Sequence, residues 1–209
     1  MTDNYEKNYE SLRSWLADLD VEAVYQRLGL TEPVDGCLHL DLLRRHYRID
    51  QHAVHDEGGE GKPNVNCQSA LIWYLTYGGV GEPHYKFQPL RAFTEGLVFA
   101  GNNQDGNWQA SATERAFAKN EESIVQAMGI LGAEPIEAGS GFDYAWRLLV
   151  LPKMPIEIRF CRSDEEFPCS IKIYPDETAM NYLPFEALAV FIGCIYGEIT
   201  HIGRTLNGG

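Results

Sequence analysis

Apolar residues recur every three to four positions in several stretches of the chain, a spacing that predicts amphipathic helices. A first helix is expected over residues 5–19, and a second begins after Asp20, which can cap it, and ends at Gly29. Further helices are predicted from a cap at Asn66 to residue 77, from a capping box at residues 111–114 to about residue 131, and from Pro184 onward.

Other stretches alternate apolar and polar residues, which is typical of half-buried strands. The predicted strands span residues 38–42, 46–50, 134–137, 142–151, 156–161 and 170–174. Glycine, proline and charge mark residues 56–63 as a flexible loop. The pattern predicts an α+β fold in which helices pack on a mainly antiparallel sheet, with a C-terminal β-meander closed by a helix. We expect a single domain over 1–209, with an N-terminal helical lobe at about 1–57.

The net charge of the chain argues against some classes of binding partner. The 209 residues include 17 basic and 30 acidic ones, a formal charge of −13, so the field repels a phosphate backbone and argues against nucleic acid. No uninterrupted apolar run approaches the ~20 residues that span a bilayer, and the N-terminus lacks the regions of a signal peptide. A cytoplasmic protein without a membrane contact is expected. The five cysteines form no C-x-x-C pair, which predicts reduced, mostly buried thiols.

Three C-terminal motifs carry a family resemblance: Leu151-Pro152-x-x-Pro155, Asp164-x-Glu166-Phe167-Pro168 and Tyr182-Leu183-Pro184-x-Glu186. With them the chain resembles the prokaryotic domain-of-unknown-function family numbered thirty-seven eighty-six. The resemblance implies no established activity. Some members look fused behind an iron–sulfur module of the kind found in corrinoid and one-carbon proteins of anaerobes. Because this chain lacks clustered cysteines, the resemblance implies that any such cluster sits on a partner protein.

Acidic residues crowd the predicted reversal between the last two strands. Asp164 and Glu166 are the pair expected to converge there, and two carboxylates can share a hard cation or raise one another's pKa. The alternative is a hairpin turn whose carboxylates accept hydrogen bonds from local backbone N–H groups.

The motif His52-x-x-His55-Asp56-Glu57 offers imidazole and carboxylate donors, and its two histidines have a spacing that can chelate zinc on a helix. The glycines that follow favour a loop instead, with both imidazoles in solvent. A metal site would also need a third ligand from elsewhere, for which Cys37, His39 and His84 are candidates.

Aromatic side chains offer a third kind of candidate site. A planar ligand could pack against them, although helical spacing is more often that of a core; the group comprises Trp73, Tyr74, Tyr77, Tyr85 and Phe87. Cys161, between Arg159 and Arg162, is the cysteine best placed for a thiolate, with a packed thiol as the alternative. The chain has no phosphate-loop or serine-hydrolase motif.

These observations leave three hypotheses open. The first is a ligand-binding or accessory protein linked to anaerobic cofactor or one-carbon metabolism, whose partner is a small molecule or an iron–sulfur or corrinoid protein. The second is a metal-dependent hydrolase or transferase that uses Asp164 and Glu166. The third is a protein-interaction module without a small-molecule site. The sequence identifies no cofactor.

Overall fold

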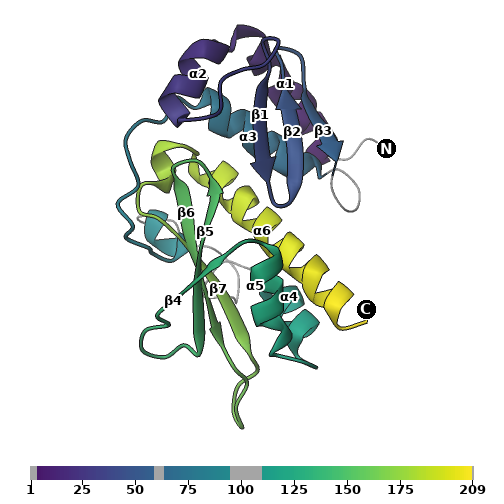
Figure 1. Cartoon of the computed structure of the whole chain (residues 1–209), viewed down its shortest axis with the longest axis vertical. Helices are drawn as coiled ribbons and strands as arrows, with labels where there is room; N and C mark the ends of the chain where they lie inside the picture. The colour runs from purple at the N-terminus through teal and green to yellow at the C-terminus, as the bar shows by residue number, and fades with distance from the viewer. Residues whose placement is uncertain (1–3, 59–63, 95–109, 209) are drawn as a thin grey trace. The chain divides into compact units, whose positions relative to one another are not determined.

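A computed structural model describes residues 4–58, 64–94 and 110–208. These residues contain six α-helices, a three-stranded and a four-stranded antiparallel sheet (Figure 1), which confirms the α+β fold. The chain divides into two compact units, each assembled from separate segments. Unit 1 comprises Met1–His84, Val150–Met154 and Thr178–Phe191, and unit 2 comprises Tyr85–Leu149, Pro155–Glu177 and Ile192–Gly209. The single domain over 1–209 stays a prediction.

The helices of unit 1 are close to those predicted. They are α1 (Asn4–Arg13), the 3₁₀-helix η1 (Ser14–Asp18), α2 (Val21–Leu28) and α3 (Val65–Thr76). The Asp20 carboxylate accepts a hydrogen bond from the Ala23 N–H at 3.0 Å, and Gly29 ends α2 in the left-handed conformation. The cap of α3 is Asn64, not Asn66, because the Asn64 side chain accepts from the Asn66 N–H.

The sheet of unit 1 contains β1 (Leu38–Leu42), β2 (Arg45–Ile49) and β3 (Val54–Gly58), in that order. One face is apolar and buried: Leu38, Leu40, Leu42, Tyr47, Ile49 and Val54. The other face is polar and only partly covered. Strand β3 was not predicted, and it corrects the start of the loop expected at 56–63; the rest of that loop lies outside the described residues. The sequence did not predict this strand because it contains Asp56 and Glu57, and aspartate and glutamate are less frequent in strands than elsewhere.

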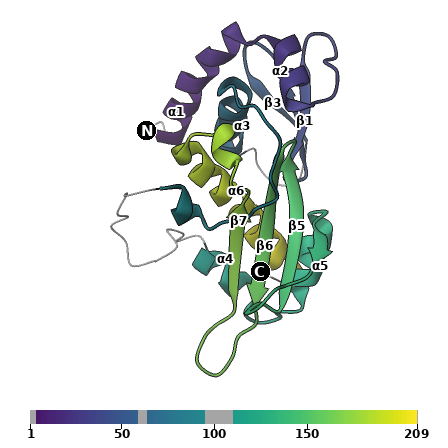
Figure 2. The same cartoon turned by 90° about the vertical axis from the view of Figure 1, so that its left-hand side faces the viewer.

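The four-stranded sheet, most of which lies in unit 2, is the predicted meander, with strand order β4-β5-β6-β7, and Figure 2 shows β5, β6 and β7 side by side. The strands are β4 (Glu134–Ile136), β5 (Tyr144–Leu151), β6 (Met154–Cys161) and β7 (Ser170–Pro175), and two short 3₁₀-helices, η2 (Leu90–Phe93) and η3 (Ala179–Asn181), lie elsewhere in the chain.

The single helix predicted after residue 111 is two helices, α4 (Ala110–Phe117) and α5 (Ser123–Ile130). Residues 118–120 between them are polar or small and exposed, so no burial holds them in a helix. The Ser123 hydroxyl donates to the Asn120 carbonyl at 2.6 Å and closes the turn. The side chain of Ser111, the expected cap, lies outside the described residues.

The closing helix α6 (Phe185–Leu206) contributes its first seven residues to unit 1 and the remainder to unit 2. In unit 2 it packs on β7, where the Tyr196 hydroxyl accepts from the Ile173 N–H and donates to the Ile171 carbonyl, both at 3.2 Å. By length and composition α6 could cross a membrane, although no uninterrupted apolar run of that length was seen in the sequence. Of its most apolar window, 56% is buried inside the protein, as in the core helix of a soluble domain.

Candidate metal centre

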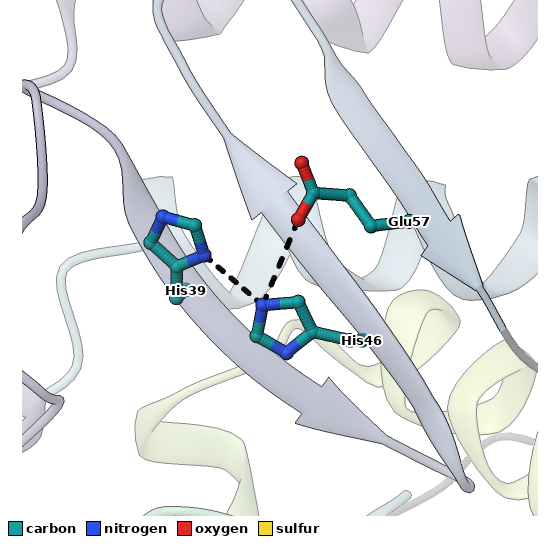
Figure 3. Close-up of side chains that lie close together, drawn as sticks. All are labelled: His39, His46 and Glu57. Atoms are coloured by element: carbon teal, nitrogen blue, oxygen red, sulfur yellow. Dashed lines mark hydrogen bonds and ion pairs between the residues drawn. The ribbon is translucent and has the colours of Figure 1, made fainter.

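Three metal-ligating side chains converge on the polar face of the β1–β2–β3 sheet. They are His39 from β1, His46 from β2 and Glu57 from β3 (Figure 3). One ligand atom from each lies within 4.8 Å of the other two. Among the residues that the structure describes, this is the one group of three such side chains that could hold a metal ion.

The distances suit a common metal ion. His39 Nδ1 and His46 Nε2 are 3.0 Å apart, and His46 Nε2 lies 3.8 Å from Glu57 Oε2. Around a tetrahedral zinc ion with bonds of about 2.0–2.1 Å, neighbouring ligand atoms are about 3.3 Å apart. The two separations lie on either side of this value, and the third, between His39 and Glu57, is within 4.8 Å, so side-chain rotations are needed to bring all three atoms to bonding distance.

A hydrogen bond sets the protonation of His46. Its Nδ1 lies 2.7 Å from Asp41 Oδ1, and because an ionised carboxylate only accepts hydrogen bonds, Nδ1 carries the proton. When the ring is neutral, Nε2 has a lone pair that can accept a hydrogen bond from His39 Nδ1 or, when His39 carries its proton on Nε2 instead, can bind a metal ion together with His39 Nδ1. Carboxylates hold metal-ligating histidines in this way and raise their basicity.

Glu57 reaches this face through an irregularity in the sheet. Strands β2 and β3 pair Tyr47 with Asp56, but the next pair is His46 with Gly58, so Glu57 is an extra residue in a β-bulge. Bulges re-aim side chains and are frequent next to functional sites. Here the bulge directs Glu57 toward His46, while Asp56 forms a buried ion pair with Arg45 at 2.7 Å.

The Arg48 guanidinium orients the Glu57 carboxylate. Arg48 Nε donates to Glu57 Oε1 at 2.9 Å, which leaves Oε2 facing His46. Arg48 Nη1 lies 3.1 Å from Asp50 Oδ2 and 3.5 Å from the Cys37 sulfur. Glu57 is thereby held in a fixed orientation, as Asp41 holds His46.

The predicted pair His52 and His55 lies close to this centre without joining it. His52 is exposed in a bend, and His55 on β3 pairs with Asp50 at 2.8 Å. Burial raises the pKa of Asp50, but hydrogen bonds from the N–H groups of His52 and Ala53, from His55 and from Arg48 outweigh it, so the pKa lies well below its ordinary value. The two histidines do not share a helix, and their role as ligands stays a prediction.

Asp164 and Glu166 lie in the exposed connection between β6 and β7. The Asp164 carboxylate accepts hydrogen bonds from the N–H groups of Glu166 and Phe167 at 2.8 and 2.7 Å. These two bonds, that of Phe167 foremost, lower the pKa of Asp164. The geometry is that of the turn weighed as the alternative, and a catalytic role for the pair stays a prediction.

The aromatic candidates separate between the units. In unit 1, Trp73 contacts Trp15 edge-on with ring centroids 4.6 Å apart, and the centroid of Tyr77 lies 6.3 Å from that of Trp73. In unit 2, Tyr85 is 54% exposed, and the Arg147 guanidinium lies 5.4 Å from its ring centroid. A shared planar-ligand site stays a prediction.

The five cysteines are free thiols, and Cys67, Cys169 and Cys194 are buried. Burial, with lesser contributions from Glu121 and Glu114, raises the pKa of Cys169 to about 11, which makes it a poor nucleophile at neutral pH. The Cys161 thiol donates to the Gly141 carbonyl at 2.9 Å.

Comparison with known families decides the classification. A family model described as a domain of unknown function, DUF3786, matches residues 20–198. The chain belongs to the DUF3786 family. The match covers every residue of the candidate centre in this DUF3786 chain. No curated protein and no solved structure matches it.

Sequence reasoning named His39 only as a candidate third ligand and Glu57 only as a carboxylate next to the His52 and His55 pair, and it missed His46. The predicted strands left three residues between them, whereas the turn uses only Leu43 and Arg44, and the resulting register places His46 across from Asp41 and two pairs from His39. Nothing in the sequence placed Glu57 beside His39 and His46, because its position depends on the bulge.

Proposed function

We propose that this protein is an accessory protein that binds one divalent transition-metal ion through His39, His46 and Glu57. The observation that carries the proposal is the convergence of these ligand atoms within 4.8 Å, together with the Asp41 carboxylate on the far side of the His46 ring. Imidazole and carboxylate together suit zinc, iron, cobalt or nickel.

Three protein ligands leave coordination positions for water or for a ligand. The centre lies on a partly exposed sheet face, where Glu57 is exposed and both histidines are half-buried. A small molecule with an oxygen or nitrogen donor can therefore reach the metal. This supports the ligand-binding hypothesis. From the family resemblance we also propose that the protein acts in the cytoplasm, in anaerobic cofactor or one-carbon metabolism, and that its partner is an iron–sulfur or corrinoid protein.

A second candidate function is metal-dependent hydrolysis or group transfer. It is favoured by the same open position, because catalytic zinc sites have three protein ligands and activate a bound water. In that case the metal of the His39, His46 and Glu57 centre, and not the Asp164 turn, would activate the water.

Cobalt titration tests the proposal, since Co²⁺ replaces zinc and its visible absorbance reports the number and type of ligands. We expect saturation at one equivalent of Co²⁺, and loss of that absorbance in His46→Ala. The matched control is His52→Ala, which removes an exposed imidazole outside the centre and should titrate as the wild type does. Loss of cobalt binding in His52→Ala but not in His46→Ala would move the site to the predicted pair and overturn the assignment.

A further inference from the structure

A groove on unit 1, apart from the residues of the metal centre, has the composition of a cation-binding site. Its volume is about 410 Å³, within the size range of ligand pockets. It is lined by Trp15, Asp18, Leu19, Asp20, Val24, Arg27, Leu75 and Thr76. Residues from η1, α2 and α3 and the link between η1 and α2 thus form one concave surface.

The floor of the groove contains three buried apolar side chains and one hydrogen-bonded arginine. Leu19, Val24 and Leu75 are 6%, 5% and 0% exposed. The Arg27 guanidinium donates to the carbonyls of Leu75 and Gly79 at 2.8 and 2.9 Å. The Leu75 carbonyl lies at the C-terminal end of α3, where the helix carries partial negative charge, so the charge of Arg27 is already partly balanced.

One wall is the indole of Trp15, which remains 41% exposed although Trp73 holds it edge-on. An exposed indole face attracts a cation through its π electrons. The exposed carboxylates Asp18 and Asp20 lie beside it. In the described residues, Asp18 forms no side-chain hydrogen bond or ion pair, and Asp20 uses only Oδ1 to cap α2.

From this geometry we propose that the groove binds a lysine or arginine side chain of an extended basic segment of a partner protein. The aliphatic stem of that side chain lies on the apolar floor, and its charge lies between Trp15 and the two carboxylates. The net charge of −13 steers a basic segment toward the protein.

A peptide is favoured over a small organic cation for a physical reason. Exposed ion pairs and exposed cation–π contacts are each weak, so a lone ammonium ion gains too little in this groove to offset its lost freedom of motion. A peptide adds contacts outside the groove and a second charge.

The test is fluorescence anisotropy with a labelled nine-residue peptide of alternating lysine and serine, in 150 mM salt, against the same peptide with glutamate for lysine. We expect the wild type to bind the lysine peptide at least tenfold more tightly. The double variant Asp18→Asn, Asp20→Ser should lose about tenfold, because serine still caps α2 while both groove charges are gone.

The matched control is Glu32→Gln with Asp35→Asn, which removes the same charge from exposed positions outside the groove. Circular dichroism confirms that each variant is folded. An effect below twofold in this control supports the groove. Equal weakening in both double variants would mean general electrostatic attraction and would overturn the proposal, as would a wild type that binds neither peptide.

Discussion

Replacing Asp41 by asparagine should weaken metal binding while leaving every proposed ligand in place. In the native protein the Asp41 carboxylate accepts a hydrogen bond from His46 Nδ1 at 2.7 Å, which favours the neutral tautomer whose Nε2 carries no proton. An asparagine amide can donate to Nδ1 instead, which stabilises the tautomer whose Nε2 carries a proton and cannot bind metal.

The structure sets the size of the effect. Loss of a carboxylate behind a metal-bound histidine costs about 10- to 100-fold in affinity. The Asp41 side chain is 84% exposed, so water can replace part of the lost hydrogen bond. We therefore expect the lower end of that range, about tenfold, which corresponds to about 1.4 kcal/mol in binding free energy.

Calorimetric titration of zinc into the apo protein at pH 7 measures this affinity. Asp35→Asn serves as control, because Asp35 is an exposed aspartate that is not part of the centre. His46→Ala gives the limit of complete loss. If Asp41→Asn binds zinc as tightly as the wild type, the proposed role of Asp41 is wrong; if His46→Ala does so, His46 is not a ligand.

Three further predictions concern stability. The depressed pKa of Asp50 stabilises the native state at pH values above its unfolded pKa of about 3.9, and this contribution is lost as the pH falls toward the native pKa. In urea titrations at a series of acid pH values, Asp50→Asn should therefore make the unfolding free energy depend less steeply on pH. An unchanged pH dependence would contradict this. Gly203→Ala should lower the free energy of unfolding by about 1–3 kcal/mol, because the added Cβ would lie 2.7 Å from the Phe117 ring. Gly197→Ala, on the same helix but in open space, should raise it by up to about 1 kcal/mol. Equal melting temperatures for the two variants would refute the close packing of Phe117 against Gly203. Asp164→Ala should lower the melting temperature, since two backbone N–H groups lose their acceptor, but should bind Co²⁺ as the wild type does, and loss of the metal would instead support a site at that turn.

The sequence carried the local structure well. Helix α2 begins after Asp20 and ends at Gly29, as the capping preferences of these residues predict. The alternating apolar residues predicted the ends of β1 and of the meander strands to within about two residues. These features depend on neighbouring residues, which is why a single sequence suffices for them.

The metal centre could not be predicted from local sequence patterns, because it depends on the turn, the strand register and the bulge. The turn between β1 and β2 uses Leu43 and Arg44 at φ of 49° and 64°, a backbone conformation usually marked by asparagine and glycine. Without that mark, the register that brings His39 and His46 together was not evident. The burial of Tyr47 and the bulge at Glu57 are likewise tertiary properties.

The most direct test of the metal centre is native mass spectrometry of the apo protein reconstituted with Zn²⁺, for the wild type and for the double variant His39→Ala, His46→Ala. We predict one zinc ion per wild-type chain and none per double-variant chain at the same zinc concentration. A double variant that retains one zinc ion per chain would contradict the assignment of His39, His46 and Glu57 as the metal site.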